Sequence, residues 1–496
     1  MQRASGILLH PTALPGPFHL GDLGKEAHLF VDFLIRSGQS VWQILPLGPT
    51  GYGHSPYNAI SAFAGNPALI DLQQLVDCGD LQRSRYEAAV NGCSGIDFLQ
   101  GHTVKGKLLL EAGREFFARP INTRHQDYHI FCNKHSDWLE EFSLFMALRD
   151  NFGGQTWSDW PEALRRREPE TLAGWRKKLA ESCRLYHYQQ FVFAEQWSRL
   201  KSYANLNGIR IFGDIPIFVA YDSADVWANQ DLFQLDDQGR ATEVAGVPPD
   251  YFSKTGQRWG NPLYRWDRLA AEDFRWWLRR FDHQLHFSDL IRIDHFRGFQ
   301  ACWSIPAEEA TAVNGRWVEV PGRALFEMLR RQIKDLPIIA EDLGVITPEV
   351  EKLRDDFGFP GMVILQFAFD SGSDNPYLPD NHIANSVVYT GTHDNDTTLG
   401  WWQSLSKAQK DRVRDYLGTR RPDMPWDMIR LAVASNANLC IIPCQDVLGL
   451  GTAARFNTPG RGSGNWSWQM APAALTDELA ERLARLTAKY HRTRGR

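Results

Sequence analysis

Short, almost continuously apolar segments recur along the chain, and they are rich in isoleucine and valine. This pattern is typical of parallel strands buried on both faces, because a strand with one exposed face alternates apolar and polar residues. The segments lie at residues 6–10, 40–47, 209–219, 290–296, 337–343, 362–369, 386–394 and 439–447. The pattern therefore predicts a series of buried strands along the whole chain.

Helical spacing of apolar residues lies between most of these strands. Residues 27–34, 274–285 and 325–333 carry apolar side chains at spacings of three and four positions, which line one face of a helix. Thr347 and Pro348 predict the start of a further helix, with Thr347 as the N-cap and proline at the first helical position. Strands and helices therefore alternate along the chain.

These alternations predict an α/β fold, a (β/α)8 TIM barrel formed by residues 1–496. A doubly wound open sheet is the alternative, but it normally contains fewer strands. Two connections are too long for a simple barrel. We expect residues 70–186 to form an inserted, mostly helical subdomain. Residues 220–270 are expected to form a smaller insertion with an active-site loop at 247–259. The connection at 371–385 is rich in proline and asparagine, which argues against a long helix there.

The charge balance is close to neutral, with 54 Lys and Arg residues against 59 Asp and Glu residues and a formal net charge of −5. This mild acidity gives no reason to expect nucleic acid or an anionic membrane as a partner. No apolar run approaches the roughly 18 residues of a membrane span, and the first residues do not resemble a signal peptide. We therefore expect a soluble, cytoplasmic protein, whose oligomeric state the sequence leaves open.

Seven cysteines occur at irregular spacings, without a CxxC pair. Their odd number and spacing argue against a disulfide framework or a zinc site. We expect Cys440 and Cys444 to be buried thiols on one predicted strand. His10, His54 and His295 could be metal ligands, but the chain lacks HExxH spacing, so hydrogen-bonding roles in loops or the core fit them better. The sequence indicates no metal and no organic cofactor.

Charged residues gather at the carboxyl ends of the predicted strands. In a barrel these ends form one concave face, where the chemistry takes place. Carboxylates brought together repel one another, so their arrangement here favours a function. The residues concerned are Asp214, Arg292, Asp294, Glu341, Asp342, His393 and Asp394.

Asp294 is the candidate covalent nucleophile among these residues. Arg292 lies two positions earlier, so both side chains point to one face of the strand and the guanidinium can keep the carboxylate ionised. A structural Arg–Asp pair is the alternative, but Glu341 at the end of the next strand favours a functional pair. Asp342 alternates away from the site, and we assign it no catalytic role.

Two carboxyl groups flanking a sugar are the minimal set of a retaining glycosidase. One attacks the anomeric carbon and the other protonates the leaving oxygen, at a separation of roughly 5–5.5 Å. The anionic neighbour Asp294 would help Glu341 to keep its proton for this role. Asp394 could stabilise the positive charge that develops on the ring. The alternative is that Asp394 only caps a turn, since its segment HDNDTT is rich in turn-forming residues.

Several long segments of the chain resemble one family. IRIDHF, IIAEDLG and YTGTHDN look like the three catalytic strand ends of the α-amylase-type clan. Further segments narrow the resemblance to the amylomaltases, the disproportionating 4-α-glucanotransferases of glycoside hydrolase family 77. They lie at residues 5–16, 55–67, 213–229, 246–264 and 456–468. The resemblance covers essentially the whole chain apart from residues 70–186.

Carried over residue by residue, the resemblance implies Asp294 as nucleophile, Glu341 as acid/base and Asp394 as stabiliser of the transition state. It also implies a site for the transferred sugar, with Tyr57 stacking under that sugar and Asn465 at the barrel mouth. The substrate-binding residues are then Tyr57, Asp214, Arg292, Asp370, His393 and Asn465. The glycine run before Asn465, GRGSG, lacks the Lys-Ser/Thr ending of a phosphate-binding loop.

The two carboxyl groups do not determine whether water or another sugar chain attacks the intermediate. Loop 247–259 is the candidate for excluding water and binding an acceptor. Its aromatic residues Tyr251, Phe252 and Trp259 offer faces for sugar rings, and Gln257 can reach hydroxyl groups. The resemblance places this loop over the active site.

We therefore expect an α-1,4-glucan transferase that acts on malto-oligosaccharides and longer α-1,4-glucans by a double displacement. A hydrolase of the same clan is the first alternative. A catalytically silent glucan-binding protein is the second, and the intact set of three carboxylates argues against it.

Overall fold

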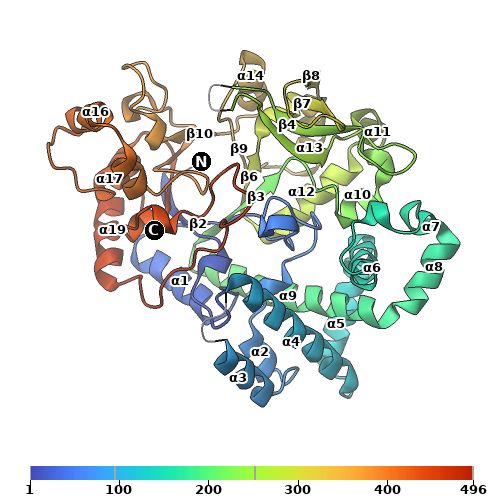
Figure 1. Ribbon diagram of the computed structural model, residues 1–496. Coiled ribbons are helices and arrows are strands. Elements are labelled where there is room, and N and C mark those ends of the chain that lie inside the picture. The colour runs from blue at the N-terminus through green and yellow to red at the C-terminus, as the bar shows by residue number, and fades with distance from the viewer. Residues whose placement is uncertain (1, 94–96, 251–252, 494–496) are drawn as a thin grey trace.

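Eight parallel strands form the centre of the computed structural model, which describes residues 2–93, 97–250 and 253–493 (Figure 1). The strands are β1 (Ala4–Leu8), β2 (Val41–Gln43), β3 (Arg210–Pro216), β6 (Leu290–Asp294), β9 (Ile338–Ala340), β10 (Gly361–Ile364), β11 (Ser386–Tyr389) and β12 (Leu439–Pro443). Their order in the sheet is β10-β11-β12-β1-β2-β3-β6-β9. Each strand overlaps one of the apolar segments, so the predicted strands are confirmed.

The two outermost strands of this order, β9 and β10, lie next to each other and nearly close the sheet into a barrel. At the junction, the Ala340 amide donates a hydrogen bond to the Pro360 carbonyl at 2.9 Å. The predicted TIM barrel is therefore confirmed, and the open doubly wound sheet is wrong.

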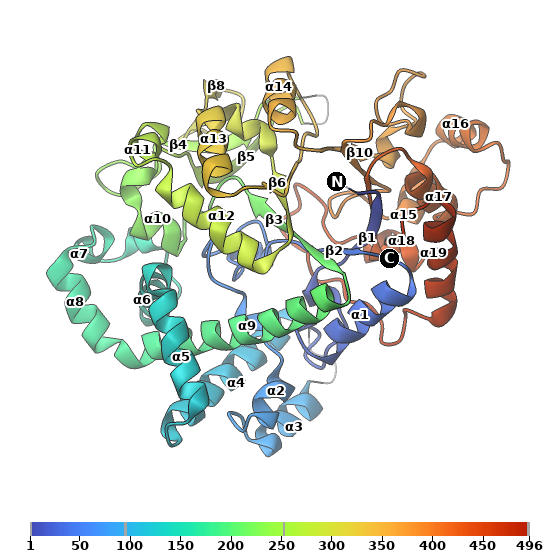
Figure 2. The same cartoon turned by 180° about the vertical axis from the view of Figure 1, so that it is seen from behind.

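Helices cover the outside of the barrel (Figure 2). Helix α1 (Lys25–Arg36) buries Ala27, Phe30, Val31 and Leu34, the apolar residues with the predicted helical spacing. Other helices of this outer layer are α9 (Ala180–Leu206), α12 (Arg275–Phe287), α13 (Gly322–Gln332), α14 (Pro348–Asp356), α17 (Trp426–Ala434) and α19 (Asp477–Lys489). In the parts of the chain that the structure describes, no helix combines the length and apolar character that crossing a membrane requires.

Two details of the helices follow the sequence closely. Helix α14 begins at Pro348 directly after Thr347, as predicted. Between β10 and β11 the chain forms only the short 3-10 turns η7 (Leu365–Phe367) and η8 (Pro379–Asn381), as the proline- and asparagine-rich connection predicted.

A group of helices between β2 and β3 lies on one side of the barrel, away from α17 and α19 (Figure 1). Its members are α2 (Leu72–Asp77), α3 (Arg83–Gly92), α4 (Phe98–Ala118), α5 (Thr123–Lys134), α6 (Ser136–Asn151), α7 (Glu162–Arg165) and α8 (Pro169–Lys178), followed by α9. An aromatic contact joins them to the barrel: Trp138 of α6 lies 5.5 Å from the ring of His283 on α12. His283 is in turn 2.6 Å from the carbonyl oxygen of Phe63, in the segment after β2.

A second sheet, antiparallel, stands beside the barrel and has the order β5-β4-β7-β8. It combines β4 (Glu243–Val247) and β5 (Gln257–Pro262) with β7 (Ala301–Pro306) and β8 (Arg316–Glu319). The sequence did not predict this sheet. Its strands are short and mix apolar, polar and charged residues, so they lack the continuous apolar character by which the barrel strands were recognised.

The prediction that Cys440 and Cys444 share one strand is wrong. Strand β12 ends at Pro443, and Cys444 begins the short helix α18 (Cys444–Val447). Proline has no amide hydrogen to continue the ladder, which favours the end of the strand at this position. Both cysteines are nevertheless buried free thiols.

The last described turn of the chain is held in place by a buried arginine. Arg492 donates hydrogen bonds to the carbonyl oxygens of Val433, Ser435, Ala437, Asn438 and Ala4, at 2.6 to 3.2 Å. These carbonyls belong to β1, to the last turn of α17 and to the segment between α17 and β12. One guanidinium therefore joins the two ends of the chain across the first and last strands of the barrel.

We expect Arg492→Ala to destabilise the protein by about 3 kcal/mol or more, because several buried carbonyls lose their hydrogen-bond donor. The midpoint of thermal unfolding, followed by tryptophan fluorescence, should fall by several degrees. Arg485→Ala is the control, since the Arg485 side chain is exposed and only 3.5 Å from an exposed Glu481 carboxylate. Equal midpoints for the two variants would contradict the prediction.

Candidate active site

A large open cavity of about 980 Å³ lies at the carboxyl ends of the barrel strands. Segments that follow β2, β9, β10, β11 and β12 contribute to its wall, together with β5 and β6. The predicted site residues that line it are Tyr57, Gln257, Trp259, Arg292, Asp294, Glu341, Asp370, His393 and Asp394. Most of the site residues predicted from the sequence therefore lie around one cavity.

Arg292 bridges two carboxylates in this wall. The register of β3 and β6 places Asp214 directly opposite Arg292. The guanidinium donates from Nη1 to Asp214 Oδ2 at 2.5 Å and from Nη2 to Asp294 Oδ1 at 2.7 Å. Although burial opposes its charge, Asp214 and Asp294 hold the pKa of Arg292 well above its usual value. Arg292 therefore stays charged and fixes Asp294 at the cavity wall.

Asp214 lies behind this wall and accepts hydrogen bonds from two residues of the wall, Tyr57 and Arg292. The Tyr57 hydroxyl donates at 2.7 Å to the same Oδ2 atom. Burial raises the pKa of Asp214, and Arg292 opposes the rise. Asp214 does not line the cavity, so its contacts orient Tyr57 and Arg292, which do.

Glu341 stands beside Asp294 at the end of the next strand. Its amide donates to the carbonyl of Ile293 at 3.1 Å, which continues the ladder between β6 and β9. Its carboxyl oxygens accept from the amides of His295 and Leu343, at 2.7 and 3.0 Å. Burial raises the pKa of Glu341 to about 8; Arg292 opposes this rise and Asp294 adds to it. Glu341 therefore holds a proton at neutral pH.

Asp342 faces the other way, as the alternation along the strand predicted. Its Oδ1 accepts from the Met362 amide at 2.7 Å, and its Oδ2 pairs with Arg354 of α14. Asp342 therefore joins β9 to β10 and to the outer helix layer.

Stacked rings form one side of the cavity. The rings of Tyr57 and His393 lie 5.1 Å apart with an angle of 13° between their planes. Trp466 lies 6.0 Å from each of them. Burial lowers the pKa of His393, although Asp394 opposes this effect. A neutral imidazole beside an aromatic face is suited to contacts with a sugar ring and its hydroxyl groups.

Asp394 has two partners that the sequence did not reveal. Asn457 donates from Nδ2 to Asp394 Oδ1 at 2.6 Å, and Arg455 donates from Nη2 to the Asp394 carbonyl at 2.5 Å. Both partners follow β12, whereas Asp394 follows β11. The signal that could have found Asn457 is the segment FNTPG, which lies in one of the stretches that resemble the family.

The predicted active-site loop enters the cavity through β5. Gln257 and Trp259 line the wall, and the indole nitrogen of Trp259 donates to Gln257 Oε1 at 3.1 Å. The Trp259 ring lies edge-on to His295, with 4.8 Å between ring centres. Tyr251 and Phe252 lie outside the described residues.

Asp370 and Asn465 occupy different kinds of position. Asp370 is exposed and lines the cavity at the segment after η7. Asn465 is not part of the lining. Its side chain accepts from the Thr458 amide at 2.9 Å and donates to the Arg461 carbonyl at 3.0 Å. In this structure Asn465 therefore braces the glycine-rich loop beside the cavity.

The histidines singled out by the sequence lie in two kinds of surroundings. His10 is buried and His295 is partly buried, and removal from solvent lowers the pKa of each to about 3. His295 follows Asp294 with a left-handed backbone, at φ 55°. This turn directs the His295 amide toward Glu341. His54 instead lies against the rings of Phe98 and His102.

Known proteins resemble this chain from end to end. A family model described as 4-alpha-glucanotransferase matches residues 9–476. The 4-alpha-glucanotransferase of Thermus thermophilus is 50% identical over 491 residues, which cover 97% of this chain and 98% of that protein. The 4-alpha-glucanotransferase of Synechocystis is 49% identical and covers 99% of this chain and 98% of its own length.

A solved structure agrees with these relatives. The amylomaltase of Streptococcus agalactiae, in complex with acarbose, superposes with a TM-score of 0.94 at 38% identity. The match covers 99% of this chain and 100% of that one.

Proposed function

This chain belongs to the 4-alpha-glucanotransferases of glycoside hydrolase family 77, and on that premise we propose that Asp294, Glu341 and Asp394 are its catalytic residues. Its activity is the transfer of a segment of a 1,4-α-D-glucan to the 4-hydroxyl group of an acceptor glucose or glucan. The names of the relatives favour this activity over the hydrolase alternative. The observation that carries the residue assignment is the ion pair of Asp294 with Arg292 beside Glu341, whose pKa is raised.

The first step forms a glycosyl-enzyme. An Asp294 carboxylate oxygen attacks the anomeric carbon of the donor glucan, and the bond from that carbon to the leaving 4-oxygen breaks. Glu341 gives its proton to the leaving oxygen, so a shortened glucan departs with a free 4-hydroxyl group. The ion pair with Arg292 supports this step, because it keeps Asp294 in its ionised, nucleophilic form.

The second step reverses these roles. Glu341, now ionised, takes the proton from the 4-hydroxyl group of the acceptor, and the acceptor oxygen attacks the same anomeric carbon. The bond to Asp294 breaks and its carboxylate is restored. Two displacements return the α-configuration of the linkage. Asp394 stabilises the positive charge that develops on the sugar ring in both steps.

The remaining wall residues are proposed to bind the glucan. Tyr57 and His393 present stacked rings to the transferred sugar, and the hydroxyl group of Tyr57 is held by Asp214, which is itself paired with Arg292. Asp370 and Asn465 serve more distant sugars, Asp370 directly and Asn465 through the loop that it braces. We propose malto-oligosaccharides and longer α-1,4-glucans as substrates, because an open cavity of about 980 Å³ has room for several sugar units.

Transfer requires that a sugar hydroxyl reaches the intermediate before water does. Trp259 and Gln257 are proposed to form part of the acceptor site, since both line the cavity. Trp259 is 38% exposed, so its ring is available for stacking under a sugar. An acceptor bound there would displace water from the anomeric carbon.

We expect Asp294 to carry the covalent sugar. Glu341→Gln incubated with α-maltotriosyl fluoride should accumulate a glycosyl-enzyme, because fluoride leaves without a proton and the second step lacks its base. Mass spectrometry of a protease digest should locate the sugar on the peptide with Asp294. Asp294→Ala should lower transfer between maltotriose molecules by at least about 10⁴-fold. An adduct on any other peptide would overturn the assignment.

The alkaline side of the pH profile should report the proton on Glu341. Because the pKa of Glu341 is raised to about 8, the acid is protonated below that value and ionised above it. We therefore expect kcat/KM for maltotriose to fall about tenfold per pH unit above pH 8. With maltotriosyl fluoride as donor, formation of the glycosyl-enzyme should not show this fall. The same decline with both donors would count against Glu341 as the acid.

Trp259→Ala should raise hydrolysis relative to transfer, because it opens the acceptor site to water. Products of maltotriose are resolved by size; glucose with maltopentaose and longer chains reports transfer, and shorter sugars alone report hydrolysis. Trp317→Ala is a matched control, since Trp317 is 40% exposed and lies on β8, at the opposite edge of the same sheet and outside the cavity lining. An unchanged ratio in Trp259→Ala would disprove this role.

A further inference from the structure

The segment from Arg455 to Asn457 lies against the backbone of the turn that carries Asp394. The backbone amide of Asn457 donates to the His393 carbonyl at 3.2 Å, and Arg455 donates from Nη2 to the Asp394 carbonyl at 2.5 Å. Arg455 also donates from Nε to the carbonyl of Asn457 at 2.7 Å. The segment therefore holds the carbonyl groups of both His393 and Asp394. Its own shape is fixed by the hydrogen bond from the Arg455 side chain to the Asn457 carbonyl.

The side chain of Asn457 adds a direct contact with the carboxylate of Asp394. Its Nδ2 is 2.6 Å from Asp394 Oδ1, and His393 Nε2 is 3.3 Å from the same oxygen. Asn457 is only 8% exposed, whereas the Asp394 side chain is 43% exposed. A buried amide therefore holds one oxygen of a carboxylate that is otherwise open to the cavity.

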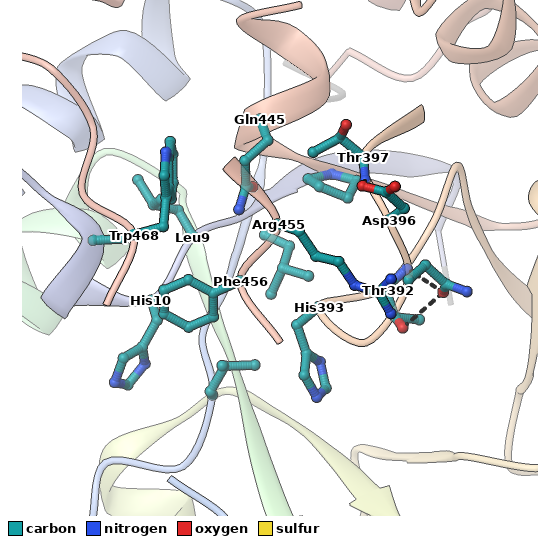
Figure 3. Close-up of a pocket in the computed structure, with 15 residues that line it drawn as sticks. Leu9, His10, Thr392, His393, Asp396, Thr397, Gln445, Arg455, Phe456 and Trp468 are labelled. Carbon is teal, nitrogen blue, oxygen red and sulfur yellow. Dashed lines mark hydrogen bonds between the residues drawn. The ribbon is translucent and has the colours of Figure 1, made fainter. Parts of the chain in front are cut away.

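Packing alone does not hold this turn. Behind it lies a small cavity of about 30 Å³, lined by His10, Thr392, His393 and Arg455 among others (Figure 3). Figure 3 shows the Arg455 side chain extending toward Thr392. Because this side of the turn lacks some side-chain contacts, the hydrogen bonds to its carbonyls contribute to its position.

We propose that Asn457 is a positioning residue for the transfer reaction. Its amide occupies Oδ1 of Asp394 and so leaves Oδ2 for the sugar, while Arg455 fixes the peptide that carries the carboxylate. Asn457 does not itself take part in proton transfer or bond formation. The proposal rests on the catalytic role assigned to Asp394 above.

Asn457 also connects Asp394 to the rim of the cavity. The glycine-rich loop at 458–465 begins directly after Asn457, and its residues Pro459 and Gly460 line the cavity. Trp466 ends the loop with a left-handed backbone, at φ 67°, and its amide donates to the Phe456 carbonyl at 2.8 Å. A glucan chain that contacts Pro459 or Gly460 therefore touches the chain two or three positions from the residue that orients Asp394.

The first test separates positioning from binding. Asn457→Ala should lower kcat for maltotriose by about 10- to 100-fold, because a misplaced carboxylate loses much of its effect on the transition state. KM should change by less than about twofold, since the stacking residues are untouched. In the background of Asp394→Ala, adding Asn457→Ala should have little further effect, because the two residues act as one unit.

The second test uses the charge of an isosteric variant. Asn457→Asp places two carboxylates in contact, and they can form a hydrogen bond only while they share a proton. Relative to the wild type, the kcat of Asn457→Asp should therefore decrease as pH rises, whereas the ratio for Asn457→Ala should stay constant. A purely structural role of Asn457 would not produce this difference.

A matched control comes from the opposite end of the barrel. Asn205 donates its side-chain amide to the Asp289 carboxylate at 2.8 Å and to the Ile209 carbonyl at 3.0 Å, ahead of β3 and β6. Asn205→Ala and Asn205→Asp remove the same kind of contact, and their kcat values should match that of the wild type at every pH. Thermal unfolding of all variants reports whether each one folds.

The outcomes distinguish this proposal from the assignment of Asp394. An active Asp394→Ala variant would overturn the catalytic role of Asp394. An inactive Asp394→Ala variant together with wild-type kcat in Asn457→Ala would overturn the positioning role of Asn457. A pH-independent ratio for Asn457→Asp would overturn it as well, even if both variants were less stable.

Discussion

One guanidinium sets the geometry on which the active site depends. Arg292 is buried between Asp214 and Asp294, and its two nitrogen atoms fix one carboxylate on each of two neighbouring strands. Without that charge the fold would bring two anions together in a poorly solvated place. The cation thus allows the barrel to present the carboxylate of Asp294, the proposed nucleophile, and through Asp214 and Tyr57 it also shapes the wall proposed to bind the sugar. The same few residues therefore provide the electrostatic pairing and part of the proposed substrate-binding wall.

Two acidic residues in adjoining positions of the barrel have opposite surroundings. Asp294 is paired with a cation, whereas Glu341 is partly buried and accepts hydrogen bonds from two backbone amides. The low polarity around Glu341 outweighs those amides and holds its proton. A fold that supplies both environments on neighbouring strands can therefore hold one carboxyl group protonated beside another that is paired with a cation, as the proposed acid and nucleophile require.

The sequence predicted the barrel because each of its strands is a continuous apolar run, and it predicted the carboxylates because they end those runs. The antiparallel sheet escaped prediction, since β7 and β8 are short and mix tryptophan with serine, arginine and glutamate. The contact of Asn457 with Asp394 escaped it for another reason. The two residues follow different strands, and no local pattern pairs them; only the adjacency of β11 and β12 in the closed sheet does. The pattern of apolar residues therefore predicts helices and strands, whereas contacts between side chains on different strands become visible only in the folded structure.

The bonds of Arg492 have a consequence for the synthesis of the protein. Strand β1 lies between β2 and β12 in the barrel, and Arg492 binds the carbonyl of Ala4 at its start. On the ribosome, the first strand therefore emerges long before the strand and the arginine that complete its surroundings. All residues from β1 to Arg492 must leave the exit tunnel before the barrel can close. Until then the edge of β1 is open, and the nascent chain depends on its early helices, or on a chaperone, to protect it.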